Sequence, residues 1–236
     1  MIRYFTAFIL IAAMGSPAMS ATSPLLPQGS PDLVRSALLL SLLAFIPAVI
    51  ISMTAFVRIA ITLAMVRHAF GMPETPPNAV LVSLSLFLTA FVMNPVITRI
   101  NAEALQPMLG GRITTEVAME RGSGPLREFM LSQTRDEDIE SIYAISKTPV
   151  PDRPEQVAIL KLTPAFILNE LRVSFTIGFV ILLPFLIIDL VVSSILLSLG
   201  MMMVPPSSIS LPIKLLMFVL IDGWRLVIEG VLGSFH

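Results

Sequence analysis

The sequence has 236 residues, of which 55% are hydrophobic and only 13% carry a charge. Charged side chains are too few to cover the surface of a water-soluble globular protein, so the composition predicts a membrane-associated chain. The formal net charge of −1 provides no general attraction to nucleic acid or to anionic lipid. With no cysteine and only two histidines, His68 and His236, the chain excludes thiolate chemistry and disfavours a histidine-bound metal. No nucleotide-binding loop or nucleophile–base arrangement is evident, so we expect neither enzymatic activity nor a cofactor.

The first 20 residues have the three parts of a secretory signal peptide. Arg3 provides the positive start, residues 4–14 form the apolar centre, and small residues precede a cleavage site between Ser20 and Ala21. The alternative is an uncleaved first transmembrane helix, which the short apolar centre disfavours. Cleavage would place the N-terminus of the mature protein in the periplasm of a bacterium.

Residues 21–98 are predicted to contain a flexible lead-in and a first hydrophobic hairpin. Two apolar segments, 33–66 and 79–98, flank a short turn rich in proline and glycine, which favours an antiparallel pair of helices. The first segment is too long for one simple span, and Pro47 divides it into two helical pieces or one kinked helix. We expect the second helix to kink or end near Pro95.

Residues 99–163 carry many charges of both signs and are predicted to form a polar helical insertion on the periplasmic side. Two stretches in it, 113–120 and 125–146, have the apolar spacing of helices. The second stretch contains an acidic cluster that lacks the glycine and the alternating oxygen ligands of a calcium-binding loop. We therefore interpret this cluster as the solvated N-terminal end of a helix, and its members are Asp136, Glu137, Asp138 and Glu140.

Residues 164–236 are predicted to form a second hydrophobic hairpin, with apolar segments at 164–199 and 211–232. Between the two segments lie three consecutive methionines, followed by a double proline: Met201, Met202 and Met203. Methionine side chains are flexible and polarizable, so a ring of such loops is suited to closing a pore and deforming around a passing chain. The alternative interpretation is apolar filler at the end of a helix. If both hairpins cross the membrane, the insertion and both ends of the mature chain lie in the periplasm.

Eight charged residues lie within the apolar segments, where each would cost about 2.5 to 3.5 kcal/mol at the centre of a bilayer. Four are positive and four are negative: Arg58, Arg172, Lys214 and Arg225, and Glu170, Asp189, Asp222 and Glu229. Paired and hydrogen-bonded charges at helix interfaces relieve this cost. We therefore predict that some pairs form between helices and some between subunits of an assembly. A proton-coupled small-molecule transporter is the alternative, and it would need an internal repeat that the two hairpins do not show.

Two segments of the sequence resemble the motifs of a known family. Residues 184–205, with the sequence PFLIIDLVVSSILLSLGMMMVP, resemble without departure the second diagnostic motif of the FliP/SctR family of type III secretion export-gate proteins. Residues 164–179, PAFILNELRVSFTIGF, are similar to the first motif, with departures at Asn169, Ser174 and Thr176. The resemblance covers nearly all of the mature chain. Other matching positions are Thr54–Ile59, Pro76–Asn78, Leu86–Thr89, Met93, Pro95, Pro125–Arg127, Phe129–Met130 and Asp222–Trp224.

The resemblance implies an all-α subunit whose membrane-associated helical hairpins join five copies of the chain into a helical, ring-like oligomer. In the family this homopentamer assembles with FliQ, FliR and FlhB, and the gate conducts unfolded flagellar proteins out of the cytoplasm. It is located in the bacterial inner membrane with periplasmic exposure. The resemblance also implies that Met201, Met202 and Met203 form a gasket at the constriction. Finally, it implies that charges are buried between subunits and that the hairpins need not span the bilayer in the finished gate.

The predicted signal peptide is typical of the flagellar branch of the family, so we favour a subunit of the export gate in the flagellar basal body. An export-gate subunit of a virulence injectisome is the alternative within the family. A purely structural scaffold of the basal body is a further alternative, and it would not need a deformable apolar constriction.

Overall fold

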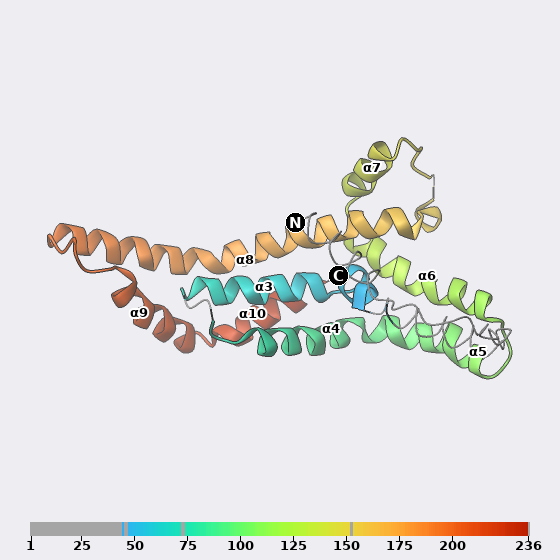
Figure 1. Cartoon of the computed structure of the whole chain (residues 1–236), viewed down its shortest axis with the longest axis horizontal. Helices are drawn as coiled ribbons and strands as arrows, with labels where there is room; N and C mark the ends of the chain where they lie inside the picture. The colour runs from blue at the N-terminus through green and yellow to red at the C-terminus, as the bar shows by residue number, and fades with distance from the viewer. Residues whose placement is uncertain (1–43, 45–46, 72–73, 152, 236) are drawn as a thin grey trace, which may run out of the picture. The chain divides into compact units, whose positions relative to one another are not determined.

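The computed structural model describes residue 44 and residues 47–71, 74–151 and 153–235 (Figure 1). Every regular element among these residues is a helix, as the family resemblance implies. The predicted signal peptide and its cleavage site between Ser20 and Ala21 lie outside the described residues.

The first hydrophobic hairpin contains α3 (Phe56–Ala69) and α4 (Asn78–Ile100), which pack against each other (Figure 1). A helical segment at Pro47–Met53 precedes α3 and meets it at a bend of 77°. At the bend, the hydroxyl group of Thr54 bonds back to the carbonyl oxygen of Ile50 and accepts the N–H of Phe56 at 3.3 Å. The apolar segment is thus divided, as predicted, but the described bend lies beyond Pro47.

The second helix of this hairpin does not end near Pro95, so of the predicted kink or end, the end is wrong. α4 includes Pro95 and continues through a π-helical turn, η1 (Asn101–Leu105), into α5 (Gln106–Leu109). The wide turn precedes Pro107, which has no N–H to donate, and the N–H of Gln106 bonds to the carbonyl oxygen of Asn101. The continuous helix therefore carries the chain from the apolar hairpin into the polar insertion.

The insertion contains α6 (Thr115–Gln133), α7 (Asp136–Ile145) and a short 3₁₀ turn, η2 (Pro154–Gln156). The two helical stretches expected here, 113–120 and 125–146, are divided at a different place: α6 runs through residues 121–124 and ends at Gln133, and α7 begins at Asp136. A Cβ atom at Gly122 would lie 3.3 Å from the Cβ of Ala104, so glycine serves here as a close contact between helices.

The third apolar region is a single 40-residue helix, α8 (Ile159–Ser198). The fourth apolar region was predicted as one segment, but the structure has two helices there: α9 (Ser207–Leu220) and α10 (Gly223–Leu232). They are separated at Asp222, whose φ of 52° lies in the left-handed region and reverses the chain. A Cβ atom at Gly223 would lie 2.2 Å from the Phe218 ring, so only glycine permits α10 to start against α9.

Within the described residues, two helices are long and apolar enough to cross a membrane: Asn78–Leu109 and α8. The bent pair of Pro47–Met53 and α3 would make a third if it forms one span. The last apolar region divides into two short helices, so the second hairpin has one helix long enough to span.

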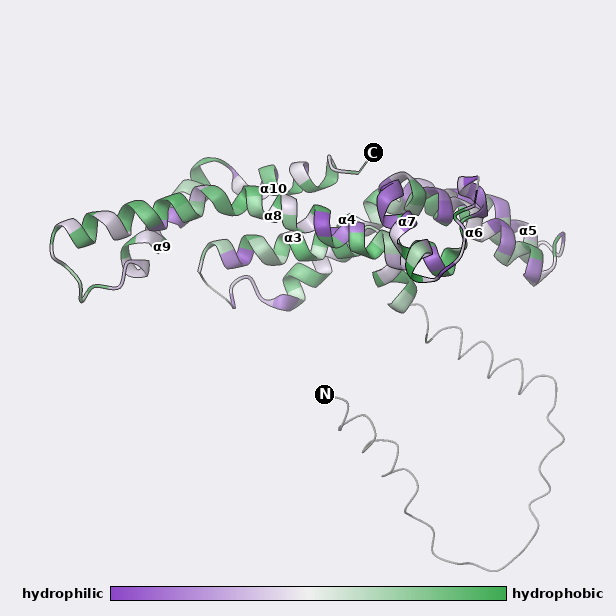
Figure 2. Ribbon diagram, turned by 90° about the horizontal axis from the view of Figure 1, so that it is seen from above, coloured by the Kyte–Doolittle hydropathy of each residue, from purple (hydrophilic) through white to green (hydrophobic). Residues whose placement is uncertain are grey.

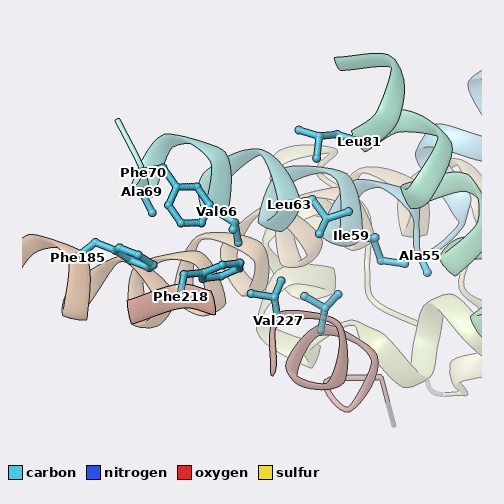
Figure 3. Packing of buried hydrophobic residues seen from close by; sticks show 11 residues of the cluster. Ala55, Ile59, Leu63, Val66, Ala69, Phe70, Leu81, Phe185, Phe218 and Val227 are labelled. Atoms are coloured by element: carbon cyan, nitrogen blue, oxygen red, sulfur yellow. The ribbon is translucent and has the colours of Figure 1, made fainter. Parts of the chain in front are cut away.

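α3 lies at the centre of the main hydrophobic core, packed against α4 and α8. Its apolar side chains face Phe185 on α8, Phe218 on α9 and Val227 on α10 (Figure 3). A second core cluster joins α6 and α7 to the first turns of α8 through Met130, Tyr143 and other residues. Figure 2 shows the contrast between the hydrophobic helices α3, α8 and α10 and the more hydrophilic α6.

Candidate functional site

The methionine loop, which we define as Met201, Met202 and Met203, follows the end of α8. Gly200 adopts a φ of 72°, and its N–H bonds to the carbonyl oxygen of Leu197 at 3.1 Å. The N–H of Met201 bonds to the carbonyl oxygen of Leu196 at 2.9 Å, which completes a glycine-terminated helix end. The three methionines are 43%, 80% and 96% exposed in chain order. Such exposure of adjacent apolar side chains indicates a surface that meets a partner.

A lysine connects the helices that carry the loop. Lys214 on α9 is buried, and its Nζ donates to Oδ2 of Asp189 on α8 at 2.6 Å. The same Nζ donates to the carbonyl oxygen of Ala69, the last residue of α3, at 3.3 Å. Two residues that the sequence marked for charge pairing, Asp189 and Lys214, therefore meet within one chain. We call this arrangement the Lys214 junction.

Aromatic rings surround the same region. The Phe70 ring meets those of Phe185 and Phe218 edge-on, at centroid separations of 5.3 and 4.7 Å. Trp224, on α10, meets Phe218 edge-on at 5.5 Å. These contacts join all three C-terminal helices to the end of α3.

A second polar group lies at the other end of α3. Arg58 is 1% exposed and forms a two-point ion pair with Glu170 on α8, in which Nε lies 2.9 Å from Oε2. Its Nη2 also donates to Oε1 of Gln133 at 3.2 Å, and its Nη1 donates to the carbonyl oxygen of Ser234 at 2.7 Å. The Phe235 ring lies 4.0 Å from the guanidinium carbon. We call these five residues the Arg58 cluster.

The pair formed by Arg172 on α8 and Asp138 on α7 corrects the interpretation of the acidic cluster. Nη1 and Nη2 of Arg172 donate to the two carboxylate oxygens of Asp138 at 2.6 and 2.8 Å. Asp138 is buried, whereas the other three acids of the cluster, at positions 136, 137 and 140, are exposed. Asp138 lies beside Ile139 on the buried side of α7, which is the sequence signal that its partner is protein rather than water.

The remaining predicted charges are exposed. Asp222 directly precedes α10, and Arg225 donates from Nε to Oε1 of Glu229, one turn further along that helix, at 2.7 Å. The hydrogen bond and the charge of Glu229 raise the pKa of Arg225 above its ordinary value. Both residues of this pair lie on α10, so the pair does not join α10 to another helix of the chain.

Sequence reasoning missed four residues that complete these groups: Gln133, Asp138, Ser234 and Phe235. Gln133 and Ser234 lie 75 and 176 positions from Arg58 in the sequence. No local pattern relates residues so far apart, and only Asp138 had a signal.

The three departures from the family's first motif have partners in the chain. The side-chain amide of Asn169 donates to the carbonyl oxygen of Gln133. The hydroxyl of Ser174 donates to the carbonyl oxygen of Glu170 at 2.5 Å, and that of Thr176 to the carbonyl oxygen of Arg172 at 2.9 Å. Asn169 thus adds a contact between α6 and α8 beside the Arg58 cluster.

The described polar groups make structural contacts between helices. No group of three or more His, Asp or Glu side chains that could hold a metal ion occurs among the residues that the structure describes. The polar side chains form ion pairs between helices, and the exposed methionines lie at the end of the longest helix. Such a site is suited to contacting another polypeptide.

Comparison with known proteins relates the chain to one family. A model of the FliP family matches residues 39–231. The flagellar biosynthetic protein FliP of Pectobacterium carotovorum subsp. carotovorum is 50% identical over 203 residues, which are 86% of this chain and 79% of that protein. The flagellar biosynthetic protein FliP of Bacillus subtilis (strain 168) is 43% identical, and the match covers 89% of this chain and 95% of that protein. The flagellar biosynthetic protein FliP of Rhizobium meliloti (strain 1021) is 40% identical over the whole length of both chains. The chain therefore belongs to the FliP family.

Proposed function

We propose that this protein is a core subunit of the flagellar protein export gate, through which unfolded flagellar proteins leave the cytoplasm. The observation that carries the proposal is the match, over most of the chain, to proteins named flagellar biosynthetic protein FliP. The flagellar role is favoured over the virulence injectisome because these relatives are named as flagellar. The role is that of a conduit component and not of an enzyme.

The exposed apolar surface supports an assembly. Only 28% and 17% of the residues in the most apolar stretches of Asn78–Leu109 and α8 are buried in the chain. Lipid or other subunits must therefore cover the rest. We propose that copies of the chain, five by family resemblance, cover one another in a helical ring with FliQ, FliR and FlhB. The residues concerned include Phe87, Phe91, Phe175, Phe179, Leu186, Ile187, Leu190 and Ile195.

The length of α8 supports a gate that extends beyond the bilayer. Its 40 residues rise roughly 60 Å at about 1.5 Å per residue, about twice the thickness of the hydrocarbon layer. The N-terminal part of α8 carries Glu170 and Arg172, with their partners on α3 and α7. We propose that this charged part lies on the periplasmic side of an inner-membrane complex.

The methionine loop is the proposed seal of the conduit. Its side chains are apolar, flexible and exposed, so they can exclude water when several copies meet and can repack around different polypeptide segments. The glycine-terminated end of α8 fixes where the loop begins. Among the predicted charges, the buried pair of Arg58 and Glu170 would then hold the helices of each subunit together in the ring.

Site-specific crosslinking in cells tests this function. A photoreactive amino acid at Met202, 80% exposed, should crosslink to a flagellar export substrate stalled in the gate. The matched control is Leu160, which is 89% exposed but lies at the start of α8. Crosslinks to the substrate at Met202 and not at Leu160 are expected. Failure of a stalled substrate to crosslink at Met202 would contradict the proposal.

A further inference from the structure

The part of α8 that leads to the methionine loop lies beyond the core cluster that contains α3. Phe185 is the last residue of α8 in the core cluster that contains α3. Beyond it, Asp189 makes the next polar contact, through Lys214. Beyond Asp189, Val192 and Leu196 of α8 are also buried, but neither belongs to the core cluster that contains α3. The position of the loop relative to α3 is therefore set near Asp189.

Lys214 is placed to fix that position because it contacts three helices at once. Its buried ammonium group pairs with a carboxylate on α8 and with a carbonyl oxygen at the C-terminal end of α3. A cation at the C-terminal end of a helix is also stabilised by the helix dipole. A change in the angle between α8 and α9 therefore has to break or stretch one of these contacts.

A cavity beside the junction leaves room for such a change. It has a volume of about 330 Å³, and its lining includes Asp189, Ser193, Ser207 and Lys214. Close-packed protein interiors do not deform continuously, so movement needs unfilled space. Here the space lies between α8 and the first turn of α9, next to the contact that holds them.

Small rotations at this point have larger effects at the loop. From Asp189 to its end at Ser198, α8 rises roughly 14 Å, so a rotation of about 10° at the junction moves the helix end by roughly 2 Å. A displacement of this size is comparable with the radius of a methyl group. It is enough to open water-sized gaps in a seal built from methionine side chains.

We infer that Lys214 is a positioning residue for the methionine loop: by joining α9 to Asp189 and to the end of α3, it sets the closed position of the loop. The inference rests on the proposed function of the loop as the seal of the conduit. It assigns Lys214 a role in closure, and not in building the ring.

The test compares ion flux through the purified export-gate complex in lipid vesicles for several variants. The variant Lys214→Met with Asp189→Asn removes both charges, so neither is left buried and unpaired. The control variant Arg225→Met with Glu229→Gln removes an exposed ion pair within α10. The positive control replaces all three methionines of the loop with alanine. Native mass of each complex reports whether it has assembled.

We expect the Lys214/Asp189 variant to assemble as the wild type does and to show a several-fold rise in ion flux, comparable with that of the triple methionine variant. The variant Lys214→Arg keeps the positive charge and the hydrogen-bond donors, so its ion flux should stay close to that of the wild type. The Arg225/Glu229 variant should match the wild type.

Three outcomes separate the two proposals. Wild-type flux in the Lys214/Asp189 variant, together with leakage in the triple methionine variant, would overturn the role of Lys214 and leave the seal standing. Failure of the Lys214/Asp189 variant to assemble would also overturn it, because the junction would then be needed to build the ring. Wild-type flux in the triple methionine variant would overturn the seal itself.

Discussion

Arg58 shows how a charge is accommodated in a chain that is mostly apolar. Its partners come from α8, from the end of α6 and from the segment that follows α10. Burying an ion pair costs desolvation free energy, which a well-aligned pair offsets only when its remaining donors also have partners. Here the described contacts involve all three guanidinium nitrogens, so the Arg58 cluster connects four parts of the chain.

Replacement of Glu170 by glutamine should destabilise the protein by about 3 to 5 kcal/mol, because it leaves Arg58 buried without its countercharge. Replacement of both residues, Arg58→Leu with Glu170→Met, should cost much less, because no buried charge remains. Chemical unfolding of the detergent-solubilised protein measures both values. Equal losses for the single and double variants would contradict a buried ion pair in the isolated chain.

At the scale of elements, the central contact is the crossing of α3 and α8. A Cβ atom built on Gly178 of α8 would lie 2.2 Å from the sulfur atom of Met65 on α3, so glycine allows the helices to approach closely. Ser174 and Glu170 lie one and two turns before it on the same face, and both are buried. The crossing therefore combines a small-residue contact with the buried ion pair.

The variant Gly178→Ala should lower the free energy of unfolding by about 1 to 3 kcal/mol, because Met65 has to move or the helices have to separate. Gly230, in α10, provides the matched control, since a Cβ atom there has nothing within 4 Å. Gly230→Ala should stabilise the helix by up to about 1 kcal/mol. Thermal unfolding of the two variants should shift in opposite directions, and a stabilised Gly178→Ala would contradict the close crossing.

The sequence predicts the elements better than their junctions. Long apolar runs identify α3, α4 and α8, because a run of this length has few alternatives to a helix. The sequence predicts a kink or an end at Pro95 and the start of a helical stretch at Pro125, yet both prolines lie inside helices. The break at Asp222 has no proline or preceding glycine, and it depends on the packing of Gly223 against Phe218. Tertiary contacts of this kind override local propensity.

The sequence predicts which residues belong to the candidate site better than it predicts which of them pair. The exposed methionine loop follows from three methionines after a glycine, a local pattern. The charged residues were identifiable because charges are rare in apolar segments, and balanced signs predicted pairing. Which residues pair was not predictable: Asp138 was assigned to solvent, and Gln133 lies in the polar insertion. These choices depend on how distant segments pack, which the local sequence does not encode.

At the scale of the whole molecule, the exposed apolar surface of α4 and α8 predicts a stable complex. Mild detergent extraction followed by native mass spectrometry should give a mass that includes several copies of the chain together with smaller subunits. Five copies are expected from the family resemblance. A monomer under these conditions would contradict the assembly.

The central claim is that the methionine loop closes a conduit formed by the assembled subunits, and ion conductance tests it most directly. Complexes carrying alanine in place of Met201, Met202 and Met203 would be compared with wild type in planar lipid bilayers. Alanine is apolar but too short to fill the constriction, so the variant should assemble normally and conduct ions where the wild type is closed. An assembled variant with the same low conductance as the wild type would contradict the claim.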